Sequence, residues 1–227
     1  MKKKMKRVLF SLLLTASLAI CAQASGAEKE YYYVEIPTYS QFDLGYPKGC
    51  EGISLYMALQ GCGYAMDISV DDFMDTMPRA EDNPEEGYVG NPTAEKNSPE
   101  NEGKRTTINP APLAEWGSLY GDVQSLEGAS CEELIAELAL GNPLVVYITS
   151  GFKDAKWGSW DWGEAVTNNH AICLVGYDGV SDEYIVNDCG SNTGVYRVEA
   201  SVFEKSYNER HFAVVVKKCE EKTNEEE

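Results

Sequence analysis

Histidine is nearly absent from this chain, because its 227 residues include only His170 and His211. Any mechanism in which an imidazole activates a nucleophile must therefore use one of these two positions. The cysteines also lack the closely spaced pairs of a zinc site, as the positions of Cys62, Cys173 and Cys189 show. We therefore expect neither a metal nor another cofactor.

Basic residues are scarce: 19 Lys and Arg stand against 37 Asp and Glu, a net charge of −18. A chain this acidic is repelled by phosphate backbones and by anionic membranes, so we expect no nucleic-acid partner. It could attract basic peptides. Solubility alone is the simpler interpretation of the surface charge, and we prefer it.

Long apolar runs are limited to residues 8–20, which follow five basic residues and precede Ala22, Gln23 and Ala24. This pattern predicts a signal peptide over residues 1–24. A retained membrane anchor is less expected, because a bilayer span needs about 20 apolar residues. Lipoprotein cleavage before Cys21 is also less expected, since Ile20 is bulkier than the usual small residue. We therefore expect an exported chain, secreted or held at the cell surface.

No internal repeat is visible, and the roughly 200 residues left after export suit one domain, predicted over residues 31–218. Residues 219–227 are acidic and predict a disordered tail. The exported chain keeps six cysteines, so reserving one as a nucleophile leaves an odd number. At least one further thiol is then free, and the sequence assigns no disulfide.

A candidate nucleophile lies in residues 41–60 (QFDLGYPKGCEGISLYMALQ), where a loop rich in turn residues leads into an apolar helix. Cys50 begins that helix. The positive end of a helix dipole stabilises a thiolate, and with a nearby histidine the pKa can fall to about 3.5–7.5. The alternative is a small buried hydrophobe, because free cysteines are among the most buried residues. Gln41 supplies an amide donor upstream.

Cys131 is the rival nucleophile, because it also begins a predicted helix, one capped by Ser130 and Glu133. The acidic side chains of Glu132 and Glu133 next to it oppose thiolate formation. We therefore prefer Cys50 and interpret Cys131 as a packed thiol.

His170 begins a predicted strand over residues 168–178, and a hairpin returns through residues 183–188. In an antiparallel strand pair, the numbers of two facing residues always add up to the same sum, which defines the register. If this sum is 358 or 360, the side chains of His170 and Asp188 lie on the same face of the sheet. An odd sum brings Asn187 to that face instead. We prefer Asp188 as the partner. His211 has no comparable partner in its own hairpin, so His170 is the better candidate base.

Two further stretches are candidates for substrate contact. Residues 79–108 form an unusually long irregular connection, which we interpret as a lid or as partly disordered chain, with residues 87–92 ordered and 93–105 mobile. A second loop carries closely spaced tryptophans that either line a groove or cover the core. The candidate substrate-binding residues are Tyr88, Trp157, Trp160 and Trp162.

Taken in order, these motifs resemble the C39-like subgroup of papain-like cysteine peptidases over about residues 36–216. The resemblance is carried by Gln41, residues 49–51 (GCE), 87–92 (GYVGNP), 141–143 (GNP), 170–178 (HAICLVGYD) and 184–188 (YIVND). It implies an α+β, papain-like fold, in which a helix bearing the nucleophile packs on a C-terminal antiparallel sheet.

The resemblance also implies an activity, namely peptide-bond hydrolysis through a thioester on Cys50. His170 would act as base and acid, Asp188 would orient the imidazole, and Gln41 would help bind the oxyanion. The expected partner is a peptide or protein substrate. Two alternatives remain open: acyl or amide transfer on the same fold, and a secreted peptide-binding module without catalysis.

Overall fold

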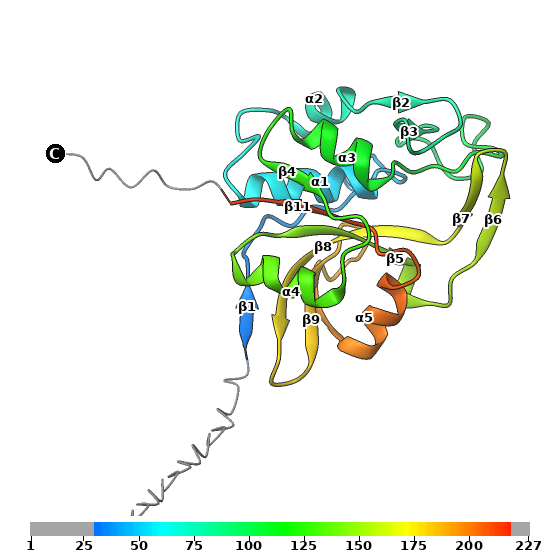
Figure 1. Ribbon diagram of the computed structural model, residues 1–227. Helices are drawn as coiled ribbons and strands as arrows, with labels where there is room; N and C mark the ends of the chain where they lie inside the picture. The colour runs from blue at the N-terminus through cyan, green and yellow to red at the C-terminus, as the bar shows by residue number, and fades with distance from the viewer. Residues whose placement is uncertain (1–29, 219–227) are drawn as a thin grey trace, which may run out of the picture.

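A seven-stranded antiparallel sheet organises residues 30–218, the part of the chain that this computed structural model describes (Figure 1). The strand order is β10-β9-β8-β5-β11-β4, and β1 pairs with the C-terminal end of β8. The strands are β1 (Tyr31–Tyr33), β4 (Val123–Ser125), β5 (Leu144–Thr149), β8 (Asn169–Asp178), β9 (Glu183–Asn187), β10 (Val195–Glu199) and β11 (Ala213–Val216). The predicted signal peptide, Cys21 and the predicted tail lie outside the described residues.

Helices cover both faces of the sheet (Figure 1). On one face lie α1 (Cys50–Gly61), α2 (Val70–Asp75) and α3 (Pro110–Gly117); on the other lie α4 (Cys131–Ala139) and α5 (Ala200–Tyr207). Alternate residues of β5 point to opposite faces, so Val145 and Tyr147 pack toward α1 while Val146 and Ile148 pack toward α5. Every residue of β5 is therefore buried.

Helix α1 is buried along most of its length, and residues 51–59 are all buried. The side chains of Ile53, Leu55, Met57 and Leu59 are fully enclosed. Each such burial contributes about 1.5–3 kcal/mol to folding. The predicted apolar core helix is confirmed, and its rigid packing fixes the position of Cys50 at its first turn.

The strand predicted over residues 168–178 and its return over 183–188 form β8 and β9. Ser69 caps α2 by accepting a hydrogen bond from the backbone N–H of Asp72. The capping box of Ser130 and Glu133 at α4 is also confirmed. One prediction is wrong: the tryptophan-rich loop forms an antiparallel hairpin, β6 (Trp157–Trp160) and β7 (Gly163–Val166), after a short 3-10 turn, Ser150–Phe152.

The long connection contains only the two-residue strands β2 (Arg79–Ala80) and β3 (Tyr88–Val89). Beyond β3 the chain wraps around the buried side chain of Asn101, which is 3% exposed. Its amide donates to the carbonyls of Asn91 and Ala94, both at 3.0 Å, and its oxygen accepts from the Asn91 N–H at 2.7 Å. This organisation contradicts the expectation of a mobile segment over residues 93–105.

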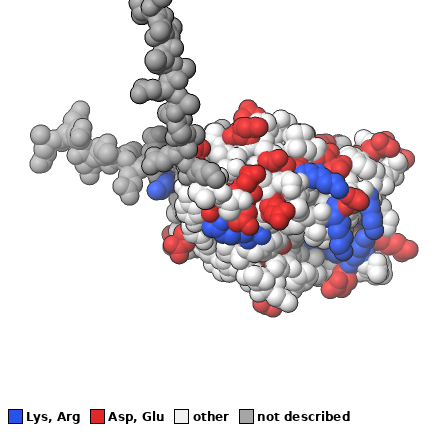
Figure 2. Space-filling model, turned by 90° about the horizontal axis from the view of Figure 1, so that it is seen from below, with Lys and Arg blue, Asp and Glu red and all other residues white. Residues whose placement is uncertain are grey.

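The surface of the described residues carries many carboxylates, and Figure 2 shows Asp and Glu side chains across one face with Lys and Arg in a few groups. Among residues 30–218, no helix combines the length and the hydropathy needed to cross a bilayer.

The register between β8 and β9 changes at a β-bulge. Next to the turn, Tyr177 pairs with Tyr184 and Gly176 pairs with Ile185, so the paired residue numbers add up to an odd sum. A bulge between Leu174 and Gly176 then shifts the pairing, so Leu174 faces Val186 and the sum becomes 360. The bulge therefore restores the even register that puts Asp188 on the face of His170.

Gly176 at this bulge is tightly enclosed. A Cβ atom there would lie 2.5 Å from the backbone oxygen of Tyr32 and 3.1 Å from Ile185 Cδ1. We predict that Gly176→Ala lowers the free energy of unfolding by about 1–3 kcal/mol, because the strand backbone cannot move away. Urea unfolding monitored by circular dichroism measures this change, and an unchanged midpoint would contradict the role assigned to the bulge.

Candidate active site

The loop before α1 is fixed from both sides. The Lys48 N–H donates to the carbonyl of Pro92 at 3.0 Å, and the Tyr88 hydroxyl donates to the carbonyl of Lys48. Tyr88 is fully buried, which contradicts the prediction that it contacts substrate. Its hydroxyl instead fixes the backbone at Lys48, two residues before Cys50.

Helix α1 is also bonded to the strand that carries the histidine. The Ser54 hydroxyl donates to the carbonyl of Ala171 at 3.2 Å, and the Cys173 thiol donates to the carbonyl of Ser54 at 3.0 Å. Ser54 lies one helical turn after Cys50, and Ala171 directly follows His170. These hydrogen bonds therefore fix the nucleophile-bearing helix against the base-bearing strand.

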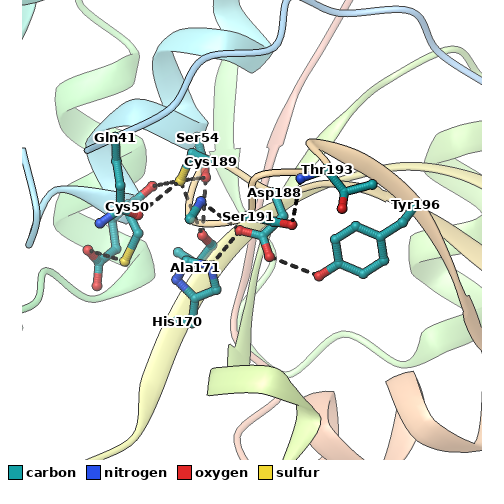
Figure 3. Close-up of polar contacts among 12 residues, drawn as sticks. Gln41, Cys50, Ser54, His170, Ala171, Asp188, Cys189, Ser191, Thr193 and Tyr196 are labelled. Atoms are coloured by element: carbon teal, nitrogen blue, oxygen red, sulfur yellow. Dashed lines mark hydrogen bonds and ion pairs between the residues drawn. The ribbon is translucent and has the colours of Figure 1, made fainter. Parts of the chain in front are cut away.

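His170 is paired with a carboxylate, as the even register predicts. Its Nε2 lies 2.7 Å from Oδ1 of Asp188. The Gly190 N–H donates to the same oxygen at 2.8 Å, and the Tyr196 hydroxyl donates to Oδ2 at 2.8 Å. Figure 3 shows the imidazole lying between Cys50 and Asp188. Its Nδ1 makes no hydrogen bond to any described residue, so it is available to a thiol or a substrate.

These bonds set the charge state of Asp188. Burial alone would raise its pKa, but the hydrogen bond and charge of His170, with the donors Gly190 and Tyr196, hold the pKa below its usual value. Asp188 is therefore ionised at neutral pH and stabilises a protonated imidazole.

Gly190 leaves no room for a side chain beside the ring. A Cβ atom at this position would lie 2.8 Å from Cε1 and 3.0 Å from Nε2 of His170. The glycine thus permits the close approach of its loop to the imidazole.

One cleft of about 610 Å³ is lined by all four predicted catalytic residues, Gln41, Cys50, His170 and Asp188. They come from the loop before α1, the start of α1, the start of β8 and the end of β9. The fold thus brings together residues that are up to 147 positions apart in the sequence.

The Cys50 thiol is protonated in this arrangement and donates to Oε2 of Glu51 at 3.2 Å. Burial raises its pKa well above the ordinary value, and the charges of Glu51 and Cys189 raise it further, while the backbone N–H of Ala171 acts in the opposite direction. This contradicts the prediction of a lowered pKa. Dehydration of the sulfur and the carboxylate beside it are the main causes of the raised pKa.

Glu51 is fully buried and was not predicted to belong to the site. Besides the Cys50 thiol, its carboxylate accepts hydrogen bonds from the Thr107 hydroxyl and, at 3.0 Å, from the Asn169 amide. Asn169 in turn accepts from Arg210. Three donors therefore converge on this carboxylate.

Gln41 is buried, at 4% exposed, with its amide fixed by its neighbours. Its Nε2 donates to the carbonyls of Pro47 at 2.9 Å and Tyr46 at 3.3 Å, and its oxygen accepts from the Cys189 thiol at 3.3 Å. To bind an oxyanion, the amide must exchange the longer of its two donor contacts.

The tryptophans lie beside this cleft rather than in it. Trp160 lines an adjoining cavity of about 460 Å³, and Trp157 and Trp162 line a third of about 220 Å³. The rings of Trp160 and Trp162 stack with centroids 5.4 Å apart. A substrate would reach these rings only if it extended beyond the cleft of Cys50.

The other described cysteines are buried, unlike Cys50, and all five of these thiols are free. Burial raises the pKa of the rival Cys131 to about 11. The remaining histidine, His211, contacts the carbonyl of Ala129 at 3.2 Å and the ring of Tyr207. Within residues 30–218, no three His, Cys, Asp or Glu side chains form a group that could hold a metal ion.

We predict that Glu51→Gln lowers the pKa of Cys50, because it removes a negative charge that raises it. The rate of Cys50 alkylation by iodoacetamide near neutral pH should rise, by up to about tenfold if the pKa falls by one. The pH–rate profile should move to lower pH. The matched control is Glu132→Gln, which removes the acid next to Cys131. An unchanged or upward-shifted profile in Glu51→Gln would contradict this role.

Comparison with known proteins completes the description of the site. The model of the Peptidase C39-like family matches residues 33–215. The fold is similar to the crystal structure of a provisionally named C39-like peptidase from Bacillus anthracis, with a TM-score of 0.71, 22% identity, and coverage of 85% of this chain and 100% of that one.

Xylellain, a cysteine protease from Xylella fastidiosa, is a more distant match, with a TM-score of 0.36, 13% identity, and coverage of 83% of this chain and 86% of that one. This likeness is too weak to support an argument. No curated protein matches the chain. The predicted mixed helix and antiparallel-sheet fold is confirmed, and because the family model spans most of the sequence, the chain belongs to the Peptidase C39-like family.

Proposed function

We propose that this protein is an exported thiol peptidase that hydrolyses peptide bonds with Cys50, His170 and Asp188. The observation that carries the proposal is the 2.7 Å contact between His170 and Asp188 in the same cleft as a partly exposed cysteine at a helix start. Family membership gives independent support for cysteine-peptidase chemistry.

The first step follows from the protonated resting thiol. On substrate binding, Cys50 transfers its proton to Nδ1 of His170, and the thiolate attacks the carbonyl carbon of the scissile bond. Asp188 stabilises the imidazolium that forms. The negative oxygen of the tetrahedral intermediate would lie near the Cys50 N–H and the Gln41 amide.

The second half of the reaction uses the same imidazole. His170 returns its proton to the leaving amine, and the C–N bond breaks to leave a thioester on Cys50. His170 then takes a proton from water, whose oxygen attacks the thioester carbonyl. The acid product departs, and the thiol is regenerated with its proton.

Export is part of the proposal because of residues 1–24, whose basic start, apolar run and small residues have the form of a signal peptide. The excess of acidic residues is a matter of solubility and carries no information about the substrate.

The test is cleavage of a diverse peptide mixture, with new termini identified by mass spectrometry. We predict cleavage by the wild type and a loss of at least about 1,000-fold in Cys50→Ala and His170→Ala, because both groups act in the same step. Cys131→Ala is the matched thiol control and should keep full activity.

Two results would contradict the proposal. Cleavage that persists in Cys50→Ala would assign the activity to another group. Products that appear only as amides of an added amine, never as acids, would replace hydrolysis by acyl transfer.

A further inference from the structure

The cleft of Cys50 has a charge opposite to that of the chain. Lys48, Lys96 and Arg105 line it, and the only carboxylate among its described lining residues is Asp188, which is already bonded to His170. Neither lysine ammonium has an ion-pair partner within residues 30–218. The cleft is therefore a site of positive potential in an acidic protein.

Arg105 is the member of this group with an unmet hydrogen-bonding need. The residue is only 7% exposed, and its buried Nε has no hydrogen-bond partner. Its one described hydrogen bond is a long contact, 3.5 Å, from Nη1 to the carbonyl of Thr106. A guanidinium offers five donors, and burying them unpaired is costly, so this side chain is prepared for an anion.

No side chain of the described protein meets that need. Within residues 30–218, no carboxylate oxygen pairs with Arg105 within the 4.0 Å that defines the ion pairs found elsewhere. Glu51 influences its charge from a distance, but the Glu51 oxygens are occupied by Cys50, Thr107 and Asn169. Arg105 also lines all three neighbouring cavities, so it lies where they meet.

We propose that the substrate of this site carries a carboxylate close to the bond that is cleaved, and that Arg105 binds it with help from Lys96 and Lys48. This inference rests on the proposed function, because it names the substrate class of the same cleft. The carboxylate belongs either to an acidic side chain or to the free carboxyl end of a peptide. A planar guanidinium can bind either one through two parallel hydrogen bonds.

The test compares two alkylating agents of nearly equal size, the anion iodoacetate and the neutral iodoacetamide. Their rates with Cys50 are measured at the same pH and low salt, and the ratio of the iodoacetate rate to the iodoacetamide rate is compared with the same ratio for N-acetylcysteine amide, which has no carboxylate. We expect the ratio to be raised about threefold or more in the wild type, because the cationic cleft concentrates the anion. The ratio cancels any change in thiolate fraction, which affects both reagents equally.

Arg105→Gln should bring the ratio close to that of N-acetylcysteine amide, and substitution of the exposed Lys96 by Gln should lower it partly. The matched control is Arg197→Gln, since Arg197 pairs with Asp178 and Glu183 at the hairpin turn, and it should leave the ratio unchanged. If Arg105→Gln does not fold, the other two measurements still test the proposal. A raised wild-type ratio that falls in Lys96→Gln supports it, and a wild-type ratio equal to that of the reference thiol contradicts it. Raising the salt to about 0.5 M should reduce the wild-type ratio by screening.

The failures of this inference and of the proposed function are distinct. Cys50 reactivity that does not depend on His170 would contradict the peptidase proposal. Reactivity that depends on His170 but shows the ratio of N-acetylcysteine amide would overturn only the carboxylate-binding proposal.

Protection of Cys50 from iodoacetamide separates the two sources of the carboxylate. One pair of peptides is Ala-Ala-Ala and its C-terminal amide, and the other is N-acetyl-Ala-Glu-Ala amide and its Gln analogue. Stronger protection by the charged member of one pair identifies that source and supports the proposal. Equal protection within both pairs counts against it.

Discussion

The packing of α1 against β8 is the constraint on which the site depends. The Ser54 hydroxyl donates to the carbonyl of Ala171, and the Cys173 thiol donates to the carbonyl of Ser54. The apolar residues of α1 fill the space above the sheet. Because both elements are buried, Cys50 and His170 keep their relative position without being neighbours in the sequence. The polar ends of the two elements meet at the cleft, where the apolar packing stops.

The charged groups within the site differ in sign from most of those on the surface. The chain is strongly acidic, yet the buried groups around Cys50 include the guanidiniums of Arg105 and Arg210 with Glu51 as the nearest described counter-charge. Burial and the charge of Glu51 raise the pKa of the Cys50 thiol, while the hydrogen bonds to Asp188 hold the pKa of that carboxyl below its usual value. In the mechanism that we propose, the thiol is protonated at rest and becomes a thiolate by proton transfer to His170. The two cations would favour that step by stabilising the negative charge that develops on the sulfur.

The sequence predicts the main elements because their signals are local. The period of apolar residues defines α1 and β5, and Ser130 with Glu133 defines the start of α4. The partner of His170 was predicted for a partly wrong reason. The register next to the turn is odd, and only the bulge before Gly176 restores the even pairing.

Glu51 and Arg105 were missed for reasons that differ. Adjacent acids were used to discount Cys131, and the same argument applies to Glu51 beside Cys50, so this signal was present in the sequence. Arg105 had no such signal, because its burial depends on how residues 93–105 fold around Asn101. The tryptophan hairpin was likewise hidden, since glycines between large rings suit a loop as well as a two-stranded ribbon.

The central claim is that Cys50 is a nucleophile whose proton passes to His170. The most direct measurement is a rapid-mixing experiment with a p-nitrophenyl ester, followed by peptide mapping of the acylated protein. We predict a burst of about one equivalent of nitrophenol and a hydroxylamine-sensitive thioester on Cys50, with the burst much slower in His170→Ala. The absence of a thioester on Cys50, or a burst of equal rate in His170→Ala, would contradict the account.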